Sequence, residues 1–428
     1  MKMPSMRAAF TMCFLGMLFY CYEYYLRVAP SVMKIELQHS FHLTETAFGY
    51  LVAFYYYAYT LMQIPVGLSI DKFGPRRVLT FACAICALGT YCFATTTLTP
   101  VAQLARFMIG FGSAFAYVGV LKLTNDWLPA KYFAPVTGLC NTLGMLGAIF
   151  GEVSMEYLVN VIGWQQTLHY AVIAGVILML TLWFVLKDKG AQKVQVTDEP
   201  LKLSAILKAL LMLSRNRQMW IIGLIGCFTF LPISGFAEVW APNYLENVGL
   251  TQSQAAWGSS LVFLGFAFGA PLWGAISERI KSRRIPMIMG ALAAAASMLY
   301  VLWIPSENVA VIYMMLFLTG FFTSVEIIIF AVGNDISDSR ASATAAAFSN
   351  MVITIAGALL APVVGLILDN SLRSSGDVIP SITHYSGALT IIPISLIAAS
   401  LLALILKESH PASASIKNAR TAKEAVLT

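Results

Sequence analysis

Two oppositely charged residues near the start of the chain are spaced for chemistry in an apolar setting. Glu23 and Arg27 lie four residues apart in a stretch that is mostly apolar and aromatic. In an α-helix this spacing places both side chains on one face, one turn apart. An arginine binds a carboxylate through paired hydrogen bonds, and Glu23 can take an ammonium or a proton. The pair predicts a site for a zwitterion, with an internal salt bridge that neutralises both groups as the alternative.

Three further charged residues stand in apolar runs, where a charge is costly and therefore suggests function. Glu326 interrupts the apolar run 323–330, which suits a proton carrier or a partner for a cation on another helix. Glu238 lies near the end of its apolar run and could instead face water. The residues assigned to proton coupling are Glu23, Glu326, Glu238 and Arg106.

Tyrosines and a glutamine crowd the first two apolar stretches. A tyrosine brings an apolar ring and a polar hydroxyl to a pocket. Because Tyr55, Tyr56 and Tyr57 are consecutive, some of them must face other helices or lipid. The residues assigned to substrate binding are Glu23, Arg27, Tyr24, Tyr56, Tyr59 and Gln63.

The elements that position these residues are predicted membrane helices. The chain is 58% hydrophobic and 11% charged, whereas soluble domains carry about 25% charged residues. Apolar runs of about 20 residues, the length that crosses a hydrocarbon core, recur along it. The twelve predicted helices cover 8–34, 46–70, 76–96, 100–123, 133–157, 163–186, 218–243, 253–277, 285–304, 309–332, 342–369 and 384–406.

Basic residues gather on one side of this arrangement. All but four of the 27 Lys and Arg residues fall on the side that holds both termini. Lys34 and Arg373 fall on the other side, and Arg27 and Arg106 within helices. Because cytoplasmic loops are rich in Lys and Arg, we predict that both termini are cytoplasmic. The net charge of +6 therefore gives no reason to expect nucleic acid.

The longest polar break, 187–217, divides the chain into halves. The predicted organisation is an N-terminal six-helix bundle over 1–190 and a cytoplasmic linker with an amphipathic helix over 191–217. A C-terminal six-helix bundle over 218–406 and a disordered cytoplasmic tail over 407–428 follow. Short outer loops without glycosylation sequons fit a bacterial inner membrane.

A charged phrase at 67–77 recurs at 274–284, and Asn141 recurs as Asn350 at nearly the same offset. Such duplication in a membrane protein usually indicates transport. The phrases are either gating elements, in which ion pairs hold one conformation, or simple cytoplasmic anchors. The second copy lacks the turn glycine of the first, which makes the first the better gate. The gating residues are Asp71, Lys72, Gly74, Arg76, Arg77, Glu278, Arg279 and Arg283.

Two motifs resemble those of the major facilitator superfamily. The loop pattern G-x-x-x-D-[RK]-x-G-[RK]-[RK] is matched except where Pro75 replaces a basic residue. Arg106, Gly110 and Gly112 are similar to the family's R-x-x-x-G-x-G stretch in helix four. The resemblance implies two six-helix bundles related by a pseudo-two-fold axis, with a substrate site between them and alternating access.

Segments 22–33 and 54–67 resemble the proteobacterial intraphagosomal amino-acid transporter subfamily. That resemblance implies uptake of an amino acid or related nutrient, although some relatives handle carboxylate siderophores. Helix five lacks the Gly-Pro element of drug antiporters, which weighs against export.

The sequence therefore predicts a proton-coupled secondary transporter that takes up a small polar organic solute such as an amino acid. The alternatives are a carrier for a carboxylate siderophore, nucleoside or other organic anion, an exporter, or a non-transporting receptor. No enzyme activity, metal or cofactor is expected. The expected partners are a small-molecule substrate, protons and the lipid bilayer, and the protein is expected to act as a monomer.

Overall fold

The structure is a computed structural model that describes residues 6–188, 211–304, 306, 308–337 and 342–409. Within these ranges the regular secondary structure is helical, without strands, which confirms the predicted all-α class. Most of the predicted linker over 191–217 and the tail beyond residue 409 lie outside the described residues. The predicted domain boundaries stay predictions.

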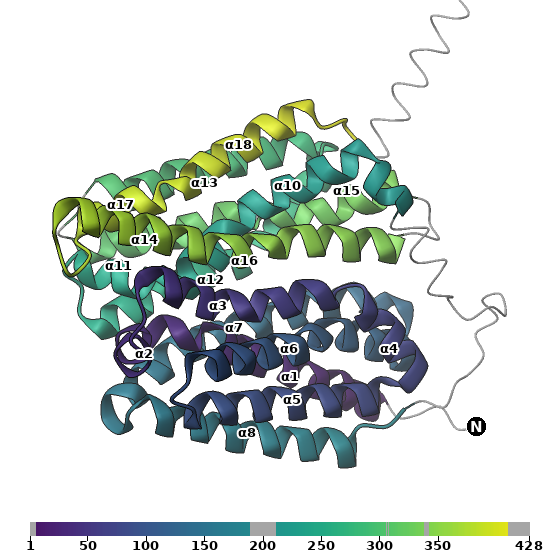
Figure 1. The fold of residues 1–428 in the computed structure, drawn as a ribbon. Coiled ribbons are helices and arrows are strands. Elements are labelled where there is room, and N and C mark those ends of the chain that lie inside the picture. Colours follow the sequence, from purple (N-terminus) through teal and green to yellow (C-terminus); the bar gives the residue numbers. More distant parts are fainter. Residues whose placement is uncertain (1–5, 189–210, 305, 307, 338–341, 410–428) are drawn as a thin grey trace, which may run out of the picture.

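The helices form two groups, which occupy the lower and upper halves of Figure 1. The first group is α1 (Met6–Val32), α2 (Lys34–Phe41), α3 (Glu45–Met62), α4 (Pro65–Phe73), α5 (Pro75–Thr95), α6 (Thr99–Trp127), η1 (Ala130–Tyr132), α7 (Phe133–Ile162) and α8 (Trp164–Val185). The second group is α10 (Arg217–Leu231), η2 (Pro232–Trp240), α11 (Ala241–Asn247), α12 (Gln252–Ile280), α13 (Arg284–Trp303), α14 (Val309–Thr323), η3 (Ser324–Ile327), α15 (Ile328–Ile336), α16 (Ser342–Ser375), α17 (Ile382–Leu389) and α18 (Ile391–Ile405).

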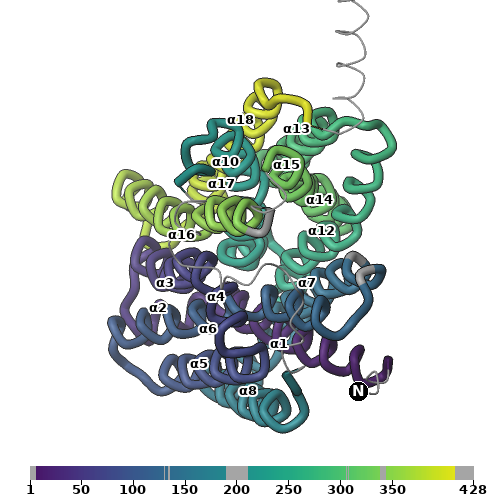
Figure 2. The backbone as a smooth tube through the Cα atoms, turned by 90° about the vertical axis from the view of Figure 1, so that its right-hand side faces the viewer, coloured from purple at the N-terminus to yellow at the C-terminus, as the bar shows by residue number. Residues whose placement is uncertain are grey.

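The two groups meet mainly along three contacts, and the end view in Figure 2 keeps them apart as lower and upper halves. α3 packs along α16, α7 packs against α12, and α1 touches η2. Most of the contact between the halves therefore involves these six elements.

Ten helical stretches of the described chain are long and apolar enough to cross a membrane. Each of the twelve predicted ranges coincides with helical structure, but α1 and α3 are not among the ten. α1 carries Glu23 and Arg27 in its outer half. α3 contains five tyrosines and ends at Met62, just before Pro65 begins α4. The count of twelve spans stays a prediction.

Charge distinguishes the two ends of the helix assembly. α4, α15 and both described termini lie at one end, to the right in Figure 1, which we call the basic end. It is defined by Arg76, Arg279, Arg284 and Lys407, which lie at or next to ends of α5, α12, α13 and α18. The other end, with α2, α11 and α17, is called the acidic end. It is defined by Glu36 of α2, Glu246 of α11, and Glu45 with Asp369, whose carboxylate accepts from the Glu45 amide. The positive-inside rule predicts that the basic end faces the cytoplasm.

The two repeated phrases form turns of positive φ at equivalent positions. Gly74 follows α4 with φ 81° and ψ 150°, a conformation essentially limited to glycine. Lys281 follows α12 with φ 53° and ψ 40°, in the left-handed region. The second copy lacks the glycine, as its sequence shows, yet it keeps the positive φ at a cost of about 1 kcal/mol.

Substitutions at these turns should have opposite effects on stability. Lys281→Gly should stabilise the protein by about 1 kcal/mol, because the strained φ is then unhindered. Gly74→Ala should destabilise it, because a Cβ would also lie 2.9 Å from a carboxylate oxygen of Asp188. Thermal unfolding of the purified protein in detergent measures both changes.

Gly163→Ala is the matched control, because Gly163 has φ 83° but open space around its missing Cβ. Gly74→Ala should cost more than this control. An unchanged or lower midpoint for Lys281→Gly would show that the Lys281 turn is unstrained.

Candidate functional site

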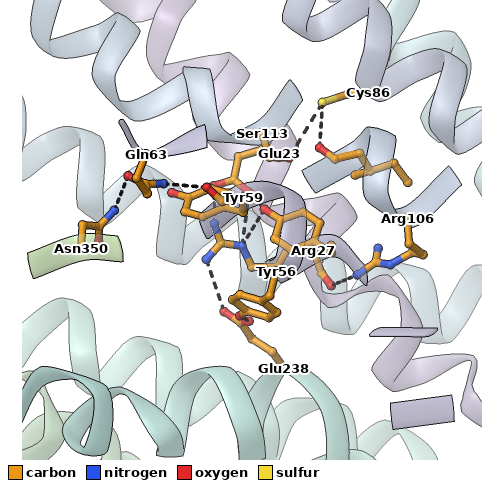
Figure 3. Close-up of polar contacts among 12 residues, drawn as sticks. Glu23, Arg27, Tyr56, Tyr59, Gln63, Cys86, Arg106, Ser113, Glu238 and Asn350 are labelled. Carbon is orange, nitrogen blue, oxygen red and sulfur yellow. Dashed lines mark hydrogen bonds and ion pairs between the residues drawn. The ribbon is translucent and has the colours of Figure 1, made fainter. Parts of the chain in front are cut away.

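Arg27 is the centre of a buried polar network at the contact between the two groups (Figure 3). α1 places it one turn from Glu23, as the spacing predicts. Its Nη2 lies 2.8 Å from Glu23 Oε1 and its Nε 3.3 Å from Glu23 Oε2. The exposed fractions of Arg27 and Glu23 are only 3% and 0%. The internal salt bridge is therefore formed in this conformation.

Tyrosines from α1 and α3 surround this pair. The Tyr55 hydroxyl donates to Glu23 Oε2 over 2.7 Å and accepts from Arg27 Nε over 3.0 Å. The guanidinium carbon of Arg27 lies 4.1 Å from the ring centre of Tyr24 and 5.0 Å from that of Tyr59. Aromatic faces attract a cation electrostatically, so they partly replace its lost hydration.

Glu238 reaches the network from the second group. Its Oε1 lies 3.7 Å from Arg27 Nη1, and its Oε2 accepts a hydrogen bond from the Tyr56 hydroxyl. Glu238 is 1% exposed, so the alternative that it faces water is wrong. It belongs to the π-helix η2, which begins at Pro232. Proline lacks the N–H of a regular helix, and π-helical turns are frequent at functional sites.

Arg106 approaches the network through the backbone of α1. Its Nη1 donates to the carbonyl of Leu26 over 3.1 Å and its Nη2 to that of Arg27 over 3.4 Å. Arg106 is 1% exposed, and its Nε has no hydrogen-bond partner. Among the described residues it makes no ion pair, so its charge acts on the site without neutralising a particular carboxylate.

Gly110 explains why Tyr55 can reach Arg27. α6 crosses α3 so closely that a Cβ at Gly110 would overlap the carbonyl oxygen of Tyr55. The R-x-x-x-G-x-G motif thus supplies both the buried Arg106 and the close helix contact that fixes Tyr55.

Gln63 lies at the edge of the network and joins the halves. Its side-chain oxygen accepts from Asn350 Nδ2 over 2.7 Å, and its Nε2 donates to the carbonyl of Tyr59 over 3.3 Å. Figure 3 shows this chain of contacts running from α3 to α16. One turn away, the hydroxyls of Thr60 and Thr354 are 2.9 Å apart. The sequence marked Asn350 only as the repeat of Asn141 and did not predict its contact with Gln63.

Glu326 is separate from this network. It belongs to the 3-10 turn η3 between α14 and α15, and it is 6% exposed. Its Oε2 has no hydrogen-bond partner. Within the described ranges no cation pairs with it, so the alternative of a structural ion pair receives no support there.

Lys34, which the sequence analysis placed on the outer side, is buried at the acidic end. Its Nζ lies 2.7 Å from Glu45 Oε2 and donates to the Tyr385 hydroxyl over 2.7 Å. The same nitrogen lies 4.9 Å from the ring centre of Trp240. Lys34 thus links α2 to α3 and to α17 of the second group.

Glu152 on α7 is a second residue that sequence reasoning missed. It is fully buried and contacts Ser31 of α1. The signal was present, because Glu152 lies inside the predicted helix 133–157. A charge in an apolar run is costly and suggests function. This reasoning selected Glu238 and Glu326, and it applies equally to Glu152.

The sequence model described as the Major Facilitator Superfamily matches residues 10–362 and 234–428. The chain belongs to the Major Facilitator Superfamily. It is therefore a multi-pass membrane transporter and not an enzyme, and the resemblance drawn from the loop and helix-four motifs is confirmed.

Curated proteins that resemble this chain are described as transporters. The uncharacterized transporter YybO of Bacillus subtilis is 28% identical over 53% of this chain, and the match spans only 54% of YybO. The probable galactarate/D-glucarate transporter GarP of Escherichia coli is 24% identical over 64% of this chain and 69% of GarP. GudP of Bacillus subtilis, with the same description, is 23% identical over 89% of this chain and 88% of GudP.

Two solved structures share the superfamily fold. A bacterial homologue of the human lysosomal transporter Spinster, in an inward-facing and occupied conformation, has a TM-score of 0.77 at 15% identity, covering 94% of this chain and 97% of that one. A D-xylose–proton symporter has a TM-score of 0.73 at 15% identity, covering 94% and 98%.

The superfamily loop residues lie at the basic end, away from Arg27. Asp71 forms an ion pair with Lys122 of α6 at 3.0 Å, and the Arg76 amide donates to Asp188 over 2.9 Å. In the second copy Arg283 contacts Glu278 at 2.6 Å and Asp335 at 3.0 Å. Both copies therefore tie neighbouring helices of one half together. The gating role of these residues, and of Lys72, Gly74, Arg77 and Arg279, stays a prediction.

Gly110→Ala should disturb the network through α3. The new methyl group must push the Tyr55 backbone away, and such overpacking costs about 1–3 kcal/mol. Gly138→Ala is the control, because Gly138 lies in a helix with open space around its missing Cβ. Thermal unfolding should show a lower midpoint for the first variant only. Equal midpoints would show that the contact tolerates a methyl group.

Glu45→Gln should destabilise the acidic end. The change leaves the Lys34 ammonium buried without its carboxylate, and breaking a buried pair in this way costs about 3–5 kcal/mol. Glu36→Gln, a half-buried acid on α2, is the control and should have a small effect. Thermal unfolding measures both, and equal losses would show that the Lys34–Glu45 pair contributes little.

Proposed function

We propose that this protein is a proton-coupled carrier that takes up a small organic carboxylate across a bacterial inner membrane. In this proposal the basic end faces the cytoplasm, the chain acts as a monomer, and the two halves alternate access to the Arg27 network.

The observation that carries the proposal is the unequal binding of Arg27 by two carboxylates. Glu23 holds the guanidinium at hydrogen-bond distance, whereas Glu238 lies 3.7 Å away. A substrate carboxylate can therefore displace Glu238 from Nη1 more readily than it can displace Glu23. Arginine suits this role because its planar donors match a carboxylate.

This competition gives a physical route to proton coupling. An ionised Glu238 repels an incoming anion and occupies one face of Arg27. A protonated Glu238 does neither, so it favours anion binding, and by linkage the bound anion favours protonation. Proton and anion would then bind together, and an inward proton gradient would drive uptake.

The relatives' descriptions agree with an anionic substrate. GarP and GudP are described as probable transporters of galactarate and D-glucarate, which are dicarboxylates. An amino acid is the second candidate, because Glu23 and Glu238 together could take an ammonium beside the carboxylate on Arg27. The resemblance of segments 22–33 and 54–67 to amino-acid transporters also supports this candidate.

Other predicted residues have supporting roles in the proposal. Tyr24, Tyr56 and Tyr59 would line the substrate site. Gln63 would hold α16 through its hydrogen bond with Asn350 in one conformation and lose it in another. Glu326 would be a further proton acceptor in the second half. The ion pairs of Asp71 and Arg283 would hold the basic end in one conformation.

Transport in proteoliposomes tests the proposal. Counterflow and gradient-driven uptake would be measured with labelled galactarate, D-glucarate and a panel of amino acids. Arg27→Ala should lower both activities about a hundredfold, which corresponds to losing a charged contact of about 3 kcal/mol. Glu238→Gln should keep counterflow but lose acceleration by an inward proton gradient.

Arg373→Ala is the matched control for Arg27→Ala, because Arg373 is exposed at the end of α16. It should transport like the unchanged protein. Gradient-driven uptake at the normal rate by Glu238→Gln would overturn the coupling role of Glu238. Counterflow of amino acids without counterflow of the dicarboxylates would favour the second candidate.

A further inference from the structure

Glu152 is a buried acid that the Arg27 network does not use. It lies on α7 where this helix packs against α1 and α12, and none of its surface is exposed. Its Oε1 lies 2.8 Å from Ser31 Oγ, and its Oε2 has no hydrogen-bond partner. α1 and α7 belong to one half and α12 to the other, so Glu152 lies where the two halves meet.

The contacts of Ser31 indicate which proton state Glu152 has. Ser31 Oγ lies 2.6 Å from the carbonyl oxygen of Val28 as well as 2.8 Å from Glu152 Oε1. A hydroxyl has one hydrogen, and a carbonyl oxygen can only accept. If Ser31 donates to Val28, the shorter contact, its contact with Glu152 lacks a hydrogen. The contact with Glu152 is then satisfied only if the carboxyl group carries a proton and donates it to Ser31 Oγ.

The surroundings of Glu152 also disfavour a charge. The titratable group that faces it is another acid, Glu238 of η2, and the polar neighbours are Ser31 of α1 and Ser259 of α12. Among the described residues, no basic side chain pairs with Glu152. An ionised carboxylate buried beside a second acid, with an unpartnered oxygen, would be costly. A neutral carboxylic acid avoids this cost, and it also supplies the hydrogen for the contact with Ser31.

We propose that Glu152 is a proton-binding site whose occupancy allows the acidic ends of α7 and α12 to close. Proton binding removes the charge that closure would otherwise bury between α1, α7 and α12. When the acidic ends separate, water reaches Glu152 and the proton can leave. Low pH on that side should therefore favour the closed arrangement and high pH the open one.

The proposal rests on the proposed function only in assuming that the two halves move. It assigns the proton to a residue other than those selected from the sequence, and it needs no substrate. A test on purified protein without substrate therefore separates its failure from a failure of the transport proposal.

Infrared spectroscopy of the membrane-reconstituted protein tests the proton directly. The unchanged protein should show a carboxylic-acid C=O band that Glu152→Gln removes and Glu156→Gln leaves in place. Glu156 is the matched control, because it lies one turn further along α7 and is half-exposed. Ser31→Ala should shift the same band, since the acid loses its hydrogen-bond acceptor. If Glu152→Gln removes no acid band, or Ser31→Ala leaves the band unshifted, the proton assignment is overturned.

Spin-label distances test the link to closure. Labels at Val161 and Ser253, both exposed near the acidic ends of α7 and α12, would be placed in a chain whose seven native cysteines are replaced. The distance should lengthen with rising pH in the otherwise unchanged protein and in Glu156→Gln. It should stay short at every pH in Glu152→Gln. A Glu152→Gln variant that opens with pH like the control would overturn the role of Glu152 in closure.

Discussion

The permanent charge of Arg27 is the constraint around which the two halves are arranged. A guanidinium does not lose its proton in a protein, so its burial has to be matched by carboxylates and aromatic faces. α1 supplies Glu23 and Tyr24, α3 supplies further tyrosines, and η2 supplies Glu238 from the other half. Any separation of the halves that moves η2 from α1 therefore changes the charge around Arg27. Conformation and charge are coupled at this one residue.

The buried charges of the site are balanced only if other acids are neutral. Arg27 and Arg106 offset Glu23 and Glu238, whereas Glu152 and Glu326 have no basic partner in the described chain. These two acids lie in different halves, on α7 and in η3. Their charge depends on whether water reaches them, which makes them responsive to movement. The arginines, by contrast, keep their charge in every conformation.

Local spacing was enough to predict part of this site. The interval between Glu23 and Arg27 fixed their pairing, because a helix of known period leaves little choice. The partner from η2 could not be foreseen, since sequence alone does not tell which face of a distant helix meets α1. The partners of Lys34 could not be predicted either, because Lys34 lies at a helix end and such ends are uncertain by a few residues. Glu152 was visible but was overlooked within a glycine-rich helix.

Helix irregularity explains where several functional candidates lie. Glu238 belongs to a π-helix, Glu326 to a 3-10 turn, and Gln63 to the interruption between α3 and α4. At such points the backbone departs from the regular i to i−4 hydrogen bonds, so bending there disrupts fewer of them. An acid placed at an irregular turn can change its surroundings when the helix bends, whereas Glu152, on the regular helix α7, changes them only when a whole helix moves. Glu238 and Glu326 would thus respond to local bending in the second half, whereas Glu152 would respond to separation of the halves at α7.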